Sequence, residues 1–120
     1  VGKLTEQGQN LMAFHDDRLV GHVAYLTTGE SAPELIVFID GAYQNRGLGT
    51  ELCRQAMAHA AADGHSALRL HVDAENERAL AVYESLGFET VDRTGDRIEM
   101  RVALNEDLVR AVQAPPAERL

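Results

Sequence analysis

The stretch ELIVFIDGAYQNRGLGTELC, residues 34–53, joins one of the most apolar runs of the chain to a segment with two glycines. Residues 34–40 are nearly all apolar, as expected for a strand that is buried on both faces. From residue 48 to about residue 62, apolar side chains recur every four positions, which indicates one face of a helix. The stretch therefore predicts a strand, a glycine-containing turn and an amphipathic helix.

The N-terminus of this helix is predicted to bind an anion. The first turn of a helix carries unpaired N–H groups and a partial positive charge, which together suit a phosphate. Gly47 and Gly49 would let phosphate oxygens approach the backbone closely, and Arg46 adds a cation. The alternative is that the glycines only shape the turn between strand and helix.

Two common phosphate-binding motifs do not match this turn. A nucleotide P-loop needs four residues between its glycines and a following Lys, but five residues separate Gly41 from Gly47, and Leu48 follows. A dinucleotide fingerprint needs a third glycine three residues after Gly49, where this chain has Leu52. Neither motif therefore identifies a ligand for this turn.

The rest of the chain shows alternating and helical periodicities that predict further elements. These are strands at residues 11–15, 19–28 and 66–73, a helix from about 76 to 86, and a closing hairpin of residues 88–93 and 97–104. The strands at 34–40 and 66–73 are joined through a helix, so they are expected to be parallel neighbours. Ligands of such units bind beyond the carboxyl end of the first strand, where the glycines lie.

Composition limits the classes of partner and compartment. The chain has 120 residues, enough for one domain, and a net charge of −8, which repels nucleic acid and anionic lipid. It has no apolar run near the roughly 18 residues of a membrane span, and no signal peptide is expected at its start. Cys53 is the only cysteine, so no internal disulfide forms, and a cytoplasmic location is expected.

Neither a thiol nucleophile nor a metal site is expected. Cys53 lies within the amphipathic helix pattern, which favours a buried small hydrophobic residue over a nucleophile. The histidines form no H-x-H or H-E-x-x-H motif. They are His15, His22, His59, His65 and His71.

Gln44, Gly47 and Gly49 form the pattern Gln-x-x-Gly-x-Gly. This pattern resembles the cofactor motif Arg/Gln-x-x-Gly-x-Gly/Ala of the GNAT superfamily of acetyl-CoA-dependent N-acyltransferases. The segment ALRLHVDAENERALAVYESLGFETV, residues 67–91, resembles the next strand and helix of that family. The similarity in order and spacing extends from about residue 11 to 104. One departure is Gly41, where many relatives have Pro.

The resemblance implies an α/β fold with a mixed, mostly antiparallel sheet, whose central parallel strand pair is joined by a crossover helix and splays apart. Residues 1–104 would form a single acetyltransferase-like domain and residues 105–120 a C-terminal tail. The usual N-terminal strand and helices, which form much of the acceptor groove, are expected to be missing. The chain begins with Val1. It is thus either truncated or a minimal member, or a partner supplies that wall.

The resemblance also implies acetyl-CoA as co-substrate, without a metal. Backbone N–H groups from Gln44 through Thr50 would bind the CoA pyrophosphate. These residues are Gln44, Asn45, Arg46, Gly47, Leu48, Gly49 and Thr50. The pantetheine arm would pair with backbone near Phe38 and Ile39. Asn76 would contact the arm, although it also suits a helix N-cap.

Tyr83 is the candidate acid that protonates the departing CoA thiolate, because relatives have a tyrosine at this helix position. Its alternative role is core packing. Glu34 is the candidate base for the amine, and its alternative role is a solvated charge at the end of a strand. Weaker candidates for the base are His22, His71 and Asp73. A backbone N–H near Ile39 would stabilise the oxyanion.

These features predict an N-acetyltransferase in which a primary amine, on a small molecule or a protein, attacks acetyl-CoA directly. A non-catalytic acyl-CoA-binding or sensor module is the alternative, since binding needs the glycines but not Tyr83. An unrelated nucleotide-binding α/β domain is a third interpretation. No nucleic acid or membrane partner is expected, and the resemblance allows a homodimer.

Overall fold

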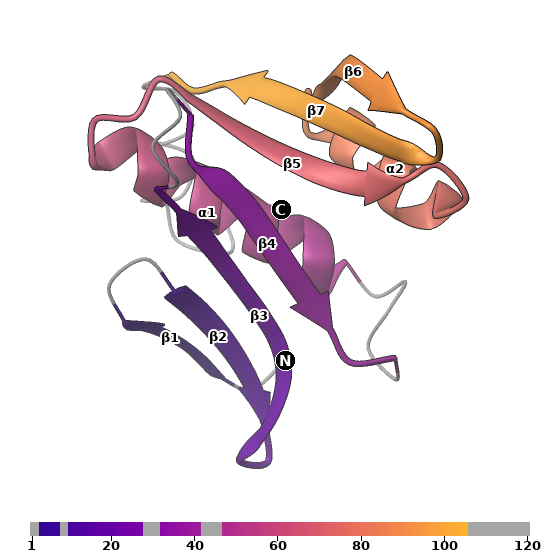
Figure 1. Ribbon diagram of the computed structural model, residues 1–120. Coiled ribbons are helices and arrows are strands. Elements are labelled where there is room, and N and C mark those ends of the chain that lie inside the picture. Colours follow the sequence, from indigo (N-terminus) through magenta and orange to yellow (C-terminus); the bar gives the residue numbers. More distant parts are fainter. Residues whose placement is uncertain (1–2, 8–9, 28–31, 42–46, 106–120) are drawn as a thin grey trace.

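The computed structural model of the chain describes residues 3–7, 10–27, 32–41 and 47–105. These residues form a seven-stranded sheet and two helices (Figure 1). The elements in chain order are β1 (Lys3–Gln7), β2 (Asn10–His15), β3 (Arg18–Leu26), β4 (Glu34–Ile39), α1 (Leu48–Ala62), β5 (Ala67–Asp73), α2 (Glu77–Ser85), β6 (Glu89–Thr94) and β7 (Arg97–Ala103). Neither helix is long and apolar enough to span a membrane, within these described residues.

The sheet has the strand order β1-β2-β3-β4-β5-β7-β6 and is antiparallel except between β4 and β5. The predicted mixed sheet with a central parallel pair joined by a crossover helix is therefore confirmed. The parallel pair is in register only at Glu34 and Arg69. Beyond that point β4 and β5 diverge, as Figure 1 shows, so the predicted splay is confirmed as well.

The expectation that the sheet lacks a strand before residue 11 is wrong. Residues Lys3–Gln7 form β1, which pairs antiparallel with β2, with Leu4 opposite Ala13. The segment KLTEQ has a single apolar side chain among polar ones, so it carries no alternating signal. Only two residues, 8 and 9, separate β1 from β2 in the sequence.

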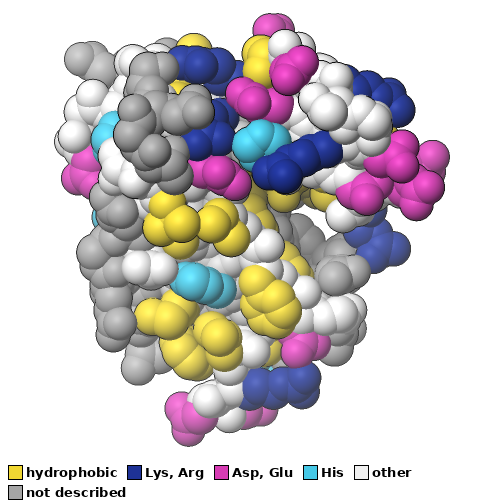
Figure 2. Space-filling view, viewed as in Figure 1, with side chains coloured by type: hydrophobic (Ala, Val, Ile, Leu, Met, Phe, Trp, Pro, Cys, Tyr) yellow, Lys and Arg dark blue, Asp and Glu magenta, His cyan; other side chains and the backbone are white. Residues whose placement is uncertain are grey.

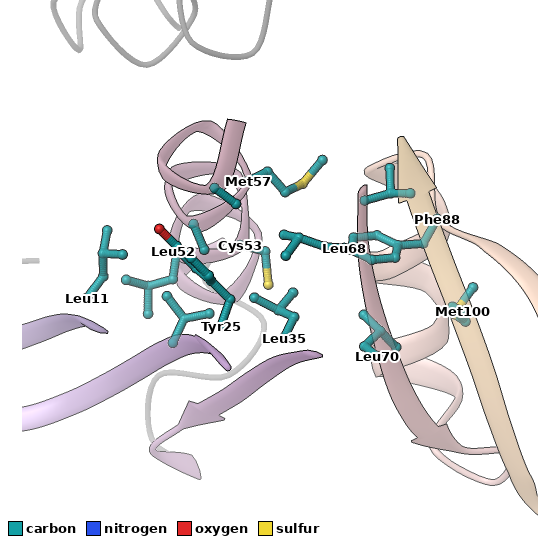
Figure 3. Packing of buried hydrophobic residues seen from close by; sticks show 14 of the residues in the cluster. Leu11, Tyr25, Leu35, Leu52, Cys53, Met57, Leu68, Leu70, Phe88 and Met100 are labelled. Carbon is teal, nitrogen blue, oxygen red and sulfur yellow. The ribbon is translucent and has the colours of Figure 1, made fainter. Parts of the chain in front are cut away.

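Helix α1 packs on one face of the sheet and supplies much of the core. The predicted helix from residue 48 to about 62 is confirmed at both ends. Its buried side chains meet apolar side chains of the strands, as Figure 3 shows for Leu52, Met57 and Leu68. Cys53 is fully buried, and burial raises the pKa of its thiol to about 12. The prediction of a buried cysteine is confirmed.

The close contact between α1 and β3 depends on Gly21. A Cβ atom at this position would lie 2.8 Å from Cδ1 of Leu52 and 3.2 Å from Cδ2 of Leu48, which is closer than van der Waals contact allows. The glycine thus lets the helix lie near the strand. This contact fixes where the N-terminal turn of α1 sits relative to β4, because Ile39 of β4 pairs with Gly21.

The two faces of the sheet differ. Leu35 and Val37 of β4 face the core cluster on the side of α1 and α2, whereas Ile36 and Phe38 are 45% and 51% exposed. Figure 1 places both described helices behind the strands, so the viewer looks at the other side of the sheet. We call this side, formed by the alternate residues of β2–β5 and β7, the open face.

Candidate functional site

Helix α1 begins where β4 and β5 have separated. Gly47 is its N-cap and has a left-handed backbone conformation, with φ of 79°, which glycine adopts without strain. The first turn closes through a hydrogen bond from Glu51 N–H to the Gly47 carbonyl, 3.0 Å long. The Gly47 cap provides no side-chain hydrogen bond, so it does not occupy the N–H groups of this turn, as an anion site requires.

A pocket of about 220 Å³ lies in front of this turn, between β4, α1 and α2. Residues from the two predicted halves of the site meet there, although they are more than twenty positions apart in the sequence. Its lining includes Ile39, Gly47, Gly49, Thr50, Asn76 and Tyr83, all predicted as site residues. Val37, Cys53, Arg78, Ala79 and Val82 complete it.

The remaining predicted residues lie elsewhere. The Leu48 side chain is buried in the core, and Phe38 points to the open face. Glu34 stands at the start of β4, the opposite end of that strand from the pocket. The predicted residues Gln44, Asn45 and Arg46 are outside the described part of the chain.

Asn76 caps α2. Its side-chain oxygen accepts a hydrogen bond from Ala79 N–H at 3.2 Å, so the predicted N-cap is confirmed. The same side chain lines the pocket. Contact with a cofactor stays a prediction for this residue.

Asn76→Ala is expected to lower the free energy of unfolding by about 1 kcal/mol, because the cap of α2 is lost. Asn76→Ser keeps an acceptor oxygen and should retain most of the stability. Urea denaturation of the two variants beside the wild type measures the difference. Equal midpoints for the Ala and Ser variants would show that this side chain does not stabilise the helix.

Tyr83 reaches the pocket from α2. Its ring packs edge-on against Phe88, with 5.8 Å between ring centroids. Burial raises the pKa of the Tyr83 phenol to about 12, and the neighbouring Cys53 adds a smaller electrostatic contribution. The phenol therefore holds its proton at neutral pH and can donate a hydrogen bond into the pocket.

On the open face, Glu34 belongs to a cluster of charged side chains that was not predicted from the sequence. One of its oxygens lies 3.3 Å from Arg69, and the other lies 3.5 Å from Nδ1 of His71. The second ring nitrogen of His71 lies 3.4 Å from Glu99. We call Glu34, His71 and Glu99 the open-face triad.

The triad depends on strand register. His71 and Glu99 are cross-strand neighbours on β5 and β7, and the only local signal for this was the alternation of each strand. No group of three His, Cys, Asp or Glu side chains is arranged to hold a metal ion in the parts of the chain described.

The two other candidates for the base have partners of their own. A ring nitrogen of His22 lies 2.9 Å from the side-chain oxygen of Asn10. Asp73 accepts a hydrogen bond from Glu75 N–H at 2.8 Å, which closes the turn before α2. Both contacts are consistent with structural roles.

Comparison with known proteins gives a family match over residues 3–88, to the description "Acetyltransferase (GNAT) family". Among curated proteins, the chain is 36% identical over 85 residues to a mycothiol acetyltransferase from Nocardiopsis dassonvillei. That alignment covers 70% of this chain and 26% of the relative. The chain thus spans about a quarter of the length of the curated relatives it matches.

Solved structures share the fold. An acetyltransferase of the GNAT family from Streptococcus pneumoniae superposes with a TM-score of 0.72 at 24% identity, covering 80% of this chain and 66% of that one. An N-acetyltransferase from Thermoplasma acidophilum in complex with coenzyme A gives a TM-score of 0.71 at 24% identity, covering 78% and 59%.

Proposed function

Because the chain belongs to the acetyltransferase (GNAT) family, we propose that it is an N-acetyltransferase that transfers an acetyl group from acetyl-CoA to a primary amine. The observation that supports this proposal is the pocket in which the glycine turn of α1 and the phenol of Tyr83 meet. The turn suits the pyrophosphate of CoA, and the phenol can donate a hydrogen bond to the sulfur that leaves the thioester.

The described residues fit acetyl-CoA at the N-terminus of α1. The backbone N–H groups of Gly47, Leu48, Gly49 and Thr50 belong to the first turn or its cap, where an anion is stabilised. Gly49 lines the pocket, and a Cβ atom added there would meet only Ile39 within 4 Å, so the backbone is accessible from the pocket side. Acetyl-CoA supplies the activated acyl group when it is bound.

Tyr83 is proposed to donate a hydrogen bond to the departing thiolate. An ordinary thiol has a pKa of about 8.5, below the value of about 12 for the Tyr83 phenol. Full proton transfer from a phenol of this pKa to a thiolate is therefore unfavourable. We therefore propose that the Tyr83 hydroxyl donates a hydrogen bond to the negative charge that develops on the leaving sulfur.

A thermal shift measurement tests the cofactor. Acetyl-CoA at 100 times its Kd should stabilise the fold by about 2.7 kcal/mol, which corresponds to about 10 °C in Tm for a domain of this size. CoA should protect similarly because it carries the same pyrophosphate and pantetheine arm as acetyl-CoA, while ATP and NAD, which lack the arm, should protect less at equal concentration. Stronger protection by ATP or NAD than by acetyl-CoA would contradict the proposal.

Protection by acetyl-CoA without turnover of any amine would instead favour the non-catalytic acyl-CoA-binding module. The decisive residue is then Tyr83, which such a module does not need. Its substitution is considered in the Discussion.

A further inference from the structure

The open-face triad contains a buried polar atom with no hydrogen bond. Nδ1 of His71 is the only such side-chain atom in the described part of the chain. Its nearest carboxylate oxygen, from Glu34, is 3.5 Å away, and the other ring nitrogen is 3.4 Å from Glu99. These separations exceed those of ordinary hydrogen bonds. A histidine with a purely structural role is expected to be hydrogen-bonded at one nitrogen or both.

Arg69 leaves one oxygen of Glu34 directed at this histidine. The buried Arg69 donates to the Ala32 carbonyl at 3.1 Å and pairs with Oε1 of Glu34 at 3.3 Å. Oε2 of Glu34 faces Nδ1 of His71. The carboxylate is thus held by an arginine on one side, while its other oxygen can exchange a proton with the imidazole.

The triad and the cofactor pocket lie on opposite faces of the same strand pair. Val37 and Ile39 of β4 line the pocket, whereas Glu34 points to the open face. Glu34 marks the last registered position between β4 and β5, and His71 is two residues further along β5. The strands part beyond that point (Figure 1), and Val37, three residues further along β4 than Glu34, lines the pocket on the other face.

The surroundings of the triad indicate the chemical class of the reactant. Figure 2 shows acidic, basic and histidine side chains together over β5 and β7, and hydrophobic side chains over β3 and β4 beside them. Among the latter, Ile36 and Phe38 are exposed on the same strand as Glu34. Two carboxylates suit an ammonium group, and the neighbouring apolar side chains suit a carbon skeleton.

Building on the proposed function, we propose that the acceptor is a primary amine with an apolar carbon skeleton, bound on the open face, and that His71 relays its proton. Glu34 takes one proton from the ammonium nitrogen, which leaves a neutral amine with a free electron pair. Oε2 of Glu34 then passes that proton to Nδ1 of His71, and the carboxylate is restored. The resulting imidazolium lies between Glu34 and Glu99 and releases the proton to water.

NMR of the histidine side chains tests the site without requiring turnover. The probe is 2-phenylethylamine, added to the full chain saturated with CoA. The imidazole signals of His71, identified by their loss in His71→Gln, should shift on titration, whereas those of His59 on α1 should not. The matched probe 2-phenylethanol, which lacks the ammonium, should cause little shift. No shift of the His71 signals up to the solubility limit of the amine would overturn the proposal.

Kinetics test the relay. With 2-phenylethylamine and acetyl-CoA, His71→Gln should lower kcat/KM by about 10- to 100-fold. Glu34→Gln should do the same, and the double variant should lose no more than either single one, because both residues act in one proton path. Multiplied losses in the double variant would show independent roles and contradict the relay. His59→Gln, a histidine outside the triad, is the control.

The two proposals fail in different ways. If acetyl-CoA does not protect the fold, the proposed function fails. If acetyl-CoA protects the fold but the NMR signals of His71 do not shift on addition of the amine, only the proposed acceptor site is wrong.

Discussion

Tyr83→Phe is expected to lower the rate of acetyl transfer by about 100- to 1,000-fold, and to leave acetyl-CoA binding almost unchanged. The substitution removes only the hydroxyl group, so the ring keeps its edge-on contact with Phe88. The lost interaction is one that forms as negative charge develops on the leaving sulfur, and such interactions change kcat more than binding. Release of the CoA thiol with a reactive amine measures kcat, and thermal shift measures binding.

Tyr25→Phe is the matched control. The Tyr25 hydroxyl donates a hydrogen bond to Asp63 at the far end of α1, and its ring is buried in the core. Removing this hydroxyl should cost about 1 kcal/mol of stability without affecting turnover by the folded protein. If Tyr83→Phe keeps full activity, the Tyr83 side chain serves only in packing. The departing thiolate would then receive no hydrogen bond from Tyr83.

The pH dependence of Tyr83 follows from the direction of its pKa shift. Burial raises the pKa of the folded state to about 12, above the ordinary value of 10.0. The stability that the protonated phenol contributes is fully present below pH 10 and is lost as the pH rises from about 10 to about 12. Loss of the Tyr83 proton should therefore produce no fall in kcat/KM between pH 7 and 10.

Local sequence patterns were sufficient to predict the elements in the central part of the fold. The periodicity of residues 48–62 defined α1 at both ends, and the glycine turn before it lies at the pocket. These signals are strong because each element carries its own apolar face. β1 was missed because its stability comes from backbone pairing with β2, and a polar strand leaves no apolar alternation to detect.

Contacts between distant strands were beyond such patterns. His71 and Glu99 are 28 positions apart, and only the register of β5 and β7 makes them neighbours. Gly21 likewise shows no local signal for its contact with Leu52, which depends on how α1 crosses β3. The sequence supplied candidates for the base one at a time. Which of them lie in contact depends on how the strands are arranged in the sheet. There, the Glu34 side chain contacts His71, whereas His22 and Asp73 contact other residues.

Gly49→Leu is expected to abolish most acetyl-CoA binding while the protein stays folded. Gly49 lines the pocket, and its backbone φ lies outside the left-handed range, so a larger residue is not strained there. The nearest atom to an added Cβ is Cγ1 of Ile39, at an ordinary contact distance of 3.5 Å. The rest of the leucine side chain would occupy the space in front of the first turn of α1.

The size of this effect follows from the hydrogen bonds that would be blocked. Hydrogen bonds to a charged group contribute about 1.5–3 kcal/mol each, so loss of two phosphate contacts should weaken binding by about 100- to 10,000-fold. Gly49→Ala adds only a methyl group and should bind acetyl-CoA much better than the leucine variant. It should also be slightly more stable than the wild type, because alanine favours a helix by up to about 1 kcal/mol over glycine.

Isothermal titration with acetyl-CoA measures the affinities, and circular dichroism checks that each variant is folded. Ala62→Leu places a leucine at the exposed far end of the same helix and should bind acetyl-CoA as the wild type does. If Gly49→Leu is folded and still binds acetyl-CoA with wild-type affinity, the phosphates do not lie at this turn. The glycines would then serve only to shape the path from β4 into α1, which is the alternative that the sequence left open.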